Sequence, residues 1–103
     1  MALWYAQQGY EMVFVSGRPD TYRAITEQWL SNHIPFEYKV LFMRRAGDHR
    51  PDNIAKKEIL HTYFPDISLI NVVIDDRRRV LEMWASQIPH AHIINVGGEE
   101  NDF

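Results

Sequence analysis

The 103-residue sequence contains no cysteine, which excludes disulfide bonds, thiolate zinc sites and cysteine nucleophiles and fits a reducing cytosol. No apolar run approaches the roughly 20 residues of a membrane helix, and the first residues lack the basic stretch and apolar core of a secretion signal. The formal net charge of −3 gives no bulk attraction to nucleic acid or to an anionic membrane. We therefore expect a cytoplasmic protein without membrane association.

The length and a hydrophobic fraction of 46% predict one small globular domain spanning residues 1–103. Helical and extended patterns alternate along it. We predict helices at 2–8, 19–31 and 51–63 and a fourth of about ten residues around Leu81, and strands at 12–15, 38–43, 70–74 and 90–96. Gly9 closes the first helix, and Gly97 and Gly98 end the last strand. This alternation predicts an α/β fold with a parallel sheet and helices on both faces.

Large apolar residues recur every three or four positions in two of the predicted helices, which indicates faces turned toward the core. They are Tyr22, Ile25, Trp29 and Leu30 in the helix at 19–31, and Ala55, Ile59 and Tyr63 in the helix at 51–63. Trp84 and the other tyrosines receive the same core assignment. Base stacking by these aromatic side chains is the minor alternative.

Two adjacent carboxylates, Asp75 and Asp76, follow the apolar strand at 70–74. A short run rich in β-branched residues is typical of a strand buried on both faces, which predicts a central position in the sheet. Ligands of open α/β sheets gather at the carboxyl ends of the strands, and paired carboxylates there suit a hard cation such as Mg²⁺. The alternative is that the two acids only cap the helix that follows.

Ser16, Gly17 and Arg18 form a turn between a predicted strand and a predicted helix, which Pro19 opens. The Ser16 hydroxyl, the free N–H groups of the helix start and the Arg18 guanidinium together suit a bound anion. The alternative is that Ser16 and Gly17 make a turn that binds nothing.

Other candidate groups carry weaker signals. Lys56 lies one helical turn after Asp52 on the same face and offers a positive charge for a phosphate, although a lysine on an amphipathic helix is usually solvated. His90 and His92 lie two apart on a predicted strand, as a metal pair would, but no third ligand accompanies them in the sequence. Neither the Gly-x-Ser-x-Gly elbow of serine hydrolases nor the Gly-x-x-x-x-Gly-Lys-[Ser/Thr] loop of a kinase occurs.

The order strand–Ser16-Gly17-Arg18, helical Lys56 and strand–Asp75-Asp76 resembles three motifs of the haloacid dehalogenase (HAD) superfamily of phosphotransferases. Over nearly the whole chain, the resemblance is to the 3′-phosphatase domain of phage polynucleotide kinase-phosphatase. The segments that carry it are 13–19, 43–52, 73–77, 80–84 and 102–103. The Arg-x-x-Gly-Asp-x-Arg run at 44–50 is more specific than the superfamily motifs.

The resemblance implies a HAD-like Rossmannoid three-layer sandwich with a parallel sheet, acting on the 3′-phosphate of a nucleic-acid end. It also implies a role for each matching residue. Phosphate or substrate binding falls to Ser16, Gly17, Arg18, Arg44 and Asp52; Lys56 is the catalytic lysine that stabilises phosphate and nucleophile; Asp75 and Asp76 bind Mg²⁺. In such an enzyme, the metal and the cations neutralise charge on the transferring phosphoryl group.

One part of the family pattern is absent, since no Asp-x-Asp occurs in the sequence. In the family, Asp-x-Asp-x-Thr ends the first, central strand and supplies the aspartate nucleophile and the aspartate acid–base. We therefore expect a truncated domain that lacks this strand and is inactive as this chain. The strands at 12–15 and 70–74 then either pair directly or find a partner in a homodimer or in a missing N-terminal segment, and we favour the homodimer.

Two further functions stay open beside an incomplete phosphatase. One is a non-catalytic module that keeps phosphate and metal binding and serves in binding or regulation. The other is an assembly module that uses exposed strand edges to pair with another chain.

Overall fold

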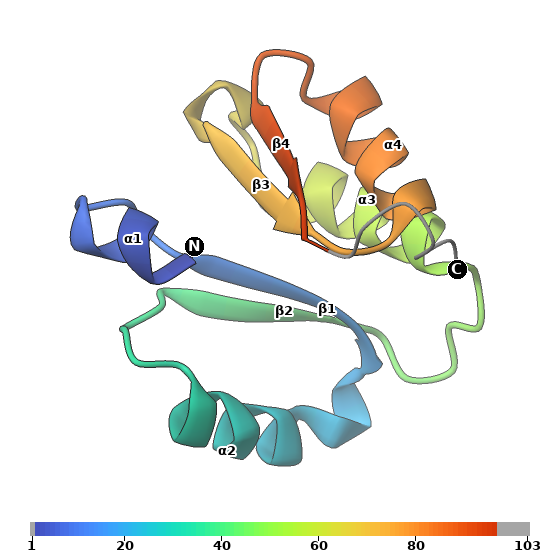
Figure 1. The fold of residues 1–103 in the computed structure, drawn as a ribbon. Coiled ribbons are helices and arrows are strands. Elements are labelled where there is room, and N and C mark those ends of the chain that lie inside the picture. Colours follow the sequence, from blue (N-terminus) through green and yellow to red (C-terminus); the bar gives the residue numbers. More distant parts are fainter. Residues whose placement is uncertain (1, 97–103) are drawn as a thin grey trace. The chain divides into compact units, whose positions relative to one another are not determined.

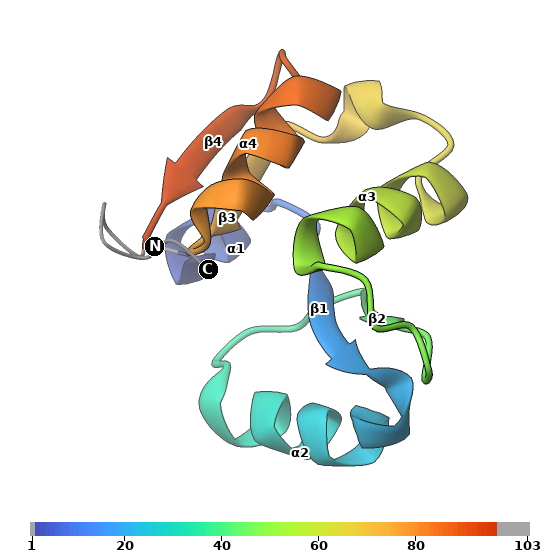
Figure 2. The same ribbon diagram turned by 90° about the vertical axis from the view of Figure 1, so that its right-hand side faces the viewer.

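The computed structural model describes residues 2–96, so Gly97 and Gly98 lie outside the described residues. The chain forms two compact units, Met1–His49 and Arg50–Phe103. Helices and strands alternate along the described chain, and each unit holds one pair of parallel strands (Figure 1, Figure 2). This confirms the predicted α/β class and the parallel pairing. None of the helices within residues 2–96 combines the length and the apolar character needed to cross a membrane.

The first unit contains α1 (Ala2–Gln7), β1 (Val13–Pro19), the 3₁₀ turn η1 (Asp20–Tyr22), α2 (Arg23–His33) and β2 (Val40–Arg44). β1 and β2 pair in parallel, starting with Val13 opposite Val40. The register shifts after Ser16, where Pro19 lies opposite Arg44. Pro19 therefore does not open the helix as predicted: its ψ of 146° is extended, and η1 separates it from α2.

Helix α1 ends in a Schellman motif, which confirms the predicted cap at Gly9. The N–H of Tyr10 donates to the carbonyl of Tyr5, and the N–H of Gly9 donates to that of Ala6, both at 3.1 Å. Gly9 has a φ of 90°, a conformation that glycine adopts without a side-chain clash. The rings of Tyr5 and Tyr10 meet edge to face with centroids 5.1 Å apart, which supplies the apolar contact typical of this motif.

The core of the first unit is small. It consists of Leu30, Leu41 and Met43, with Phe14, Ile34 and Tyr38 packed against them. Helix α2 lies along one face of the β1–β2 pair (Figure 1). Of the apolar face predicted for this helix, Leu30 alone is buried, whereas Tyr22, Ile25 and Trp29 are 47%, 63% and 52% exposed. That part of the prediction is wrong, because two strands offer too narrow a surface to cover the whole apolar face of the helix.

The second unit contains α3 (Asp52–Tyr63), the 3₁₀ turn η2 (Ile67–Leu69), β3 (Val72–Asp75), α4 (Arg78–Gln87) and β4 (His92–Asn95). β3 and β4 are parallel, from Val72 opposite His92 to Asp75 opposite Asn95. The two helices pack against each other, and α4 also packs on both strands (Figure 2). These elements match the predicted ones closely, including the ten residues of α4.

Among the described residues, the second unit has more buried residues than the first. The buried residues of the second unit are Ala55, Lys56, Ile59, Leu60, Val80, Leu81, Met83, Trp84 and Ile88. The core assignments of Ala55, Ile59 and Trp84 are confirmed, whereas Tyr63 is 54% exposed at the end of α3. Lys56 is the charged member of this set, and a buried charge requires a partner.

Within the first unit β1 pairs with β2, and within the second unit β3 pairs with β4. β3 is half-buried along its length, which differs from the central strand buried on both faces that its composition predicted. The reason is that β4 is the one strand neighbour of β3 within residues 2–96.

Candidate functional site

The second unit contains a buried ion pair at the carboxyl end of its first strand. Asp75 is the last residue of β3, and Lys56 projects from α3. The Lys56 Nζ atom lies 3.2 Å from Asp75 Oδ2, and the two side chains are 10% and 11% exposed. Both residues were candidate site residues in the sequence, and the structure brings them together.

Trp84, on α4, adds a further donor to Asp75. Its indole Nε1 donates to the same Oδ2 atom at 3.2 Å, while the backbone N–H of Asp76 donates to Oδ1 at 2.8 Å. Trp84 is 5% exposed, so its N–H needs a partner inside the protein. Sequence reasoning placed Trp84 in the core and missed this contact. The sequence signal that could have indicated this contact is a tryptophan at a core position of the helix that follows Asp75.

Opposing effects act on the Asp75 carboxyl group. Burial by itself raises its pKa, but the positive charge of Lys56 lowers it, and hydrogen bonds from Asp76, Trp84 and Lys56 lower it further. The net pKa lies below the ordinary value of 3.8. Asp75 is therefore ionised at neutral pH, with donors on both of its oxygens and about one of its roughly four lone-pair positions left open.

A second ion pair joins Asp52, the first residue of α3, to Arg77, with Arg77 Nη1 2.5 Å from Asp52 Oδ2. The next residue along the chain from Asp75, Asp76, is exposed. The N-cap residue of α4 is Arg77, and its own side chain makes no cap hydrogen bond.

The carboxylate oxygens at the end of β3 are of the chemical type that Mg²⁺ takes as ligands. Mg²⁺ takes oxygen ligands and is commonly held by one or two carboxylates together with water and substrate phosphate. Asp75 and Asp76 supply adjacent carboxylates, and Asp75 keeps an open oxygen position. Within residues 2–96, no group of three or more His, Cys, Asp or Glu side chains could hold a metal ion. His90 joins no such group, and its Nε2 atom lies 3.0 Å from the Ile70 carbonyl oxygen.

In the first unit, Ser16, Gly17 and Arg18 lie in the last part of β1, at the shift in register. We refer to this irregular end of the strand as the Ser16–Arg18 turn. The Ser16 Oγ atom accepts a hydrogen bond from the Arg18 N–H at 3.1 Å, which is the turn role considered above as the alternative to anion binding. Arg18 is exposed, and its guanidinium lies 5.5 Å from the ring centroid of Tyr22. After Pro19, the 3₁₀ turn η1 begins at Asp20 and leads into α2.

Arg44, at the end of β2, connects this turn to the loop that follows. Its Nε atom donates to the Gly17 carbonyl at 2.7 Å, and its Nη1 atom donates to the Asp48 carbonyl at 3.2 Å. Arg44 is 9% exposed, and Gly47, with a φ of 86°, lets the loop turn beside it. The guanidinium predicted to face the substrate thus contacts backbone carbonyls that shape the Gly17 turn.

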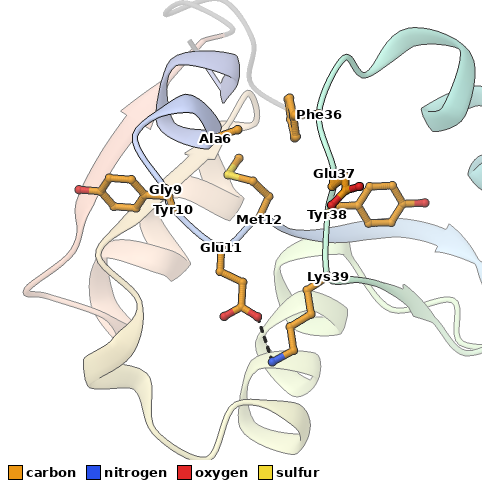
Figure 3. Close-up of a pocket in the computed structure, with 9 residues that line it drawn as sticks. All are labelled: Ala6, Gly9, Tyr10, Glu11, Met12, Phe36, Glu37, Tyr38 and Lys39. Atoms are coloured by element: carbon orange, nitrogen blue, oxygen red, sulfur yellow. Dashed lines mark ion pairs between the residues drawn. The ribbon is translucent and has the colours of Figure 1, made fainter.

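A separate pocket of about 480 Å³ opens in the first unit at the amino ends of β1 and β2. Figure 3 shows its lining residues, with Met12 and Phe36 among them and an ion pair between Glu11 and Lys39 at 3.0 Å. No candidate site residue lines it. Ligands of parallel sheets gather at the opposite, carboxyl ends of the strands, so this pocket is distinct from the Ser16–Arg18 turn.

Residues 1–97 match the family model of the polynucleotide kinase PNKP phosphatase domain. The chain belongs to this family. PNKP phosphatase domains are of the HAD type, so the resemblance drawn from the Ser-Gly-Arg, lysine and Asp-Asp motifs is confirmed. The match includes both units and all eight candidate residues.

Individual relatives support the PNKP assignment. The protein named "Putative bifunctional polynucleotide kinase/RNA ligase" of Autographa californica nuclear polyhedrosis virus is 30% identical over 73 residues, which is 71% of this chain and 10% of the viral protein. A chain in the structure of the Pnkp1/Rnl/Hen1 RNA repair complex is 33% identical with a TM-score of 0.80, over 91% of this chain and 30% of its own length. A second Pnkp1/Rnl/Hen1 structure gives 33% identity, a TM-score of 0.81 and coverage of 91% and 32%. The chain therefore spans about a tenth to a third of these relatives.

Proposed function

We propose that this chain carries phosphate- and magnesium-binding residues of a PNKP-type polynucleotide 3′-phosphatase, and that residues 1–103 form one incomplete HAD-like domain. The observation that carries the proposal is the buried Lys56–Asp75 pair at the end of β3. Burying two charges removes them from water and often yields little net stability. A buried ion pair at the ligand-binding end of a parallel strand therefore favours a role in binding or catalysis over a purely structural role.

Each candidate residue has a role in this proposal. Ser16 and Gly17 bind phosphate oxygens through the hydroxyl and backbone N–H, and Arg18 pairs with the phosphate. Arg44 supports the Gly17 turn, and Asp52 with Arg77 forms part of the wall on the substrate side. Lys56 stabilises the phosphate and the attacking group. These positive groups act by neutralising the charge of a phosphoryl group in transfer. Asp75 acts on Lys56 by fixing the position of its ammonium group.

Asp75 and Asp76 are the proposed Mg²⁺ ligands, and the ion would supply further charge neutralisation at the phosphate. Asp75 already accepts three hydrogen bonds, from Lys56, Trp84 and the Asp76 N–H. Two carboxylates, one of them largely occupied, give a weak site. We expect Mg²⁺ to bind with a dissociation constant of about a millimolar or weaker; micromolar binding in a calorimetric titration would contradict this ligand set.

The 103 residues contain no Asp-x-Asp, so in this proposal the chain alone binds a 3′-phosphate end and does not hydrolyse it. A phosphatase of the HAD type needs its aspartate nucleophile, and charge stabilisation does not replace covalent catalysis. The second candidate function is a non-catalytic module that binds phosphate and metal, because the same charged residues could serve binding without an Asp-x-Asp nucleophile.

Strand edges favour an assembly role in addition. β1 and β3 each have one strand partner within residues 2–96, and an unpaired backbone group that becomes buried costs about 1–3 kcal/mol. We propose that these edges accept another strand, from a second copy of the chain or from a segment that carries the Asp-x-Asp motif. Light scattering at micromolar concentration is expected to give a dimer mass. A monomer mass with cooperative unfolding would rule the homodimer out.

The names of the relatives suggest the first substrates to test. One named relative includes an RNA ligase and the others belong to an RNA repair complex, so an RNA 3′-phosphate end has priority over a DNA end. The test compares binding of a 3′-phosphorylated oligoribonucleotide with its 3′-hydroxyl counterpart by calorimetry in the presence of Mg²⁺. We expect the phosphate form to bind at least about fivefold more tightly, since one charge-assisted contact contributes over 1 kcal/mol.

Arg18→Ala is expected to remove this preference for the phosphate. The matched control is Arg78→Ala, because Arg78 is also exposed and pairs with Glu82 on α4. Equal binding of the two oligonucleotides by the unaltered chain would contradict the proposed function.

A further inference from the structure

One surface of the first unit has no role in the proposed phosphate site. Tyr22, at the N-cap of α2, and Ile25, Trp29 and His33 within it recur every three or four residues, which places them on one side of the helix. Tyr22, Ile25 and Trp29 are about half-exposed or more, and His33 is exposed. We refer to these four residues as the α2 stripe. With a rise of 1.5 Å per residue, it extends over roughly 16 Å.

Flat ring faces dominate the stripe. The rings of Trp29 and His33 are stacked, with centroids 4.4 Å apart and planes 13° apart. The imidazole is held in place by its Nδ1 atom, which donates to the Trp29 carbonyl at 2.8 Å. At the other end, the Arg18 guanidinium lies over the Tyr22 ring in the geometry of a cation–π contact. Such faces are suited to stacking on further planar groups.

The stripe is continuous with the proposed phosphate turn. Arg18 belongs to that turn and covers Tyr22, the first residue of the stripe. The nearby carboxylates are engaged: Glu27 pairs with Arg23 at 3.4 Å, and Asp20 accepts from the Ala46 N–H at 3.1 Å. A polyanion whose terminal phosphate lies in the turn would therefore contact aromatic ring faces next. The two neighbouring carboxylates already have partners, which reduces their repulsion of the polyanion.

We infer that the α2 stripe stacks the bases of a single-stranded polynucleotide whose 3′-terminal phosphate occupies the Ser16–Arg18 turn. Aromatic side chains beside a cationic groove are how proteins bind single strands without reading sequence. This inference rests on the proposed function for its terminal phosphate, and it adds the substrate class: an unpaired end several nucleotides long. Stacking rather than charge supplies the affinity, so the dependence of binding on salt is expected to be shallow.

The test uses the full chain and two probes with the same terminal group, a nucleoside 3′-monophosphate and a single-stranded decanucleotide 3′-phosphate. The decanucleotide is expected to bind more tightly. Trp29→Ala is expected to weaken decanucleotide binding about tenfold, the effect of losing one stacked base, and to leave the monophosphate unchanged. The matched control is Trp4→Ala, because Trp4 is 56% exposed on α1 of the same unit and lies outside the stripe.

The outcomes separate the stripe from the proposed function. If phosphate and hydroxyl ends bind alike but Trp29→Ala still weakens the decanucleotide, the stripe stands and the proposed function fails. If the monophosphate binds and the decanucleotide has no advantage, or Trp29→Ala has no effect, the stripe is overturned and the proposed function stands. No binding of either probe overturns both. A change in self-association with Trp29→Ala and unchanged decanucleotide binding would make the stripe a protein contact and overturn the inference.

Discussion

The two units have the same local plan, a parallel β-α-β arrangement, but they hold their candidate residues in different ways. In the second unit, Lys56 and Asp75 form an ion pair among the buried residues of α3 and α4. In the first unit, Ser16 and Arg18 lie in a turn that backbone contacts and Arg44 support. In the second unit, the candidate residues Lys56 and Asp75 are therefore part of the buried interior. In the first unit, the Arg18 side chain is exposed to solvent.

This difference has a direct consequence for mutations. Removing a member of the buried pair should destabilise the fold, so loss of function there is confounded with loss of structure. Removing an exposed group of the first unit, such as Arg18, should change binding with little effect on unfolding. Substitutions in both units test this contrast.

Lys56→Met is expected to destabilise the second unit by about 3–5 kcal/mol, because it leaves Asp75 buried without its cation. Urea unfolding measures the change. Lys57→Met, at the next position of α3, is the control and should change the free energy of unfolding by less than about 1 kcal/mol. Adding Asp75→Asn to Lys56→Met should restore part of the loss, and strictly additive effects would show that the two side chains do not interact.

Trp84→Phe is expected to cost about 1.5–3 kcal/mol, because it removes a hydrogen bond to a charged acceptor and keeps most of the aromatic volume. Thermal or urea unfolding checks this value. Trp29→Phe serves as the comparison, since Trp29 is half-exposed and donates to no buried carboxylate. Equal effects of the two changes would mean that the Trp84 N–H contributes nothing at Asp75.

The pH dependence of stability should differ between the native chain and Asp75→Asn. Because the pKa of Asp75 is lower in the folded chain than its ordinary value of 3.8, the unfolded chain binds this proton more readily. The stabilisation is thus complete well above pH 3.8 and is lost as pH falls through the folded pKa. Unfolding midpoints measured from pH 7 to pH 3 should fall more steeply for the native chain than for Asp75→Asn, and parallel curves would contradict the shift.

Arg44→Lys is expected to destabilise the first unit by about 1 kcal/mol, because the single ammonium of lysine does not reproduce the planar fork by which Nε and Nη1 donate to Gly17 and Asp48. Its effect on binding of a 3′-phosphate should be larger than its effect on unfolding, since the Gly17 turn loses its support. Arg45→Lys, at the exposed neighbouring position, is the control for both measurements. A binding loss no greater than that of Arg45→Lys would remove Arg44 from the site.

The sequence pattern predicted the helices, strands and site residues of the second unit better than those of the first, and the reason is physical. Helix α3 has a clear apolar period and flanking prolines, and Asp75 stands at an abrupt change from apolar to charged residues. Such local signals predicted the elements and the two charged partners. The contact between Trp84 and Asp75 was missed because periodicity assigns a residue to a face and does not say where its polar atom points.

The failures in the first unit come from tertiary context. Apolar spacing placed Trp29 in the core, but the two strands of this unit cover only the Leu30 side of α2. The sequence pattern predicts a helix start at Pro19, whereas pairing with β2 keeps this residue in the strand. Neither the number of strands beside a helix nor the extent of pairing is encoded in a local pattern, so both required the structure.

The most direct test of the account is a phosphate-release assay on the purified 103-residue chain with Mg²⁺ and a 3′-phosphorylated oligoribonucleotide. The account predicts binding of this substrate without turnover, because the binding residues are present and the sequence contains no Asp-x-Asp. Asp75→Asn is the companion variant. Phosphate release by the native chain that Asp75→Asn abolishes would contradict the account and indicate that another side chain serves as the nucleophile.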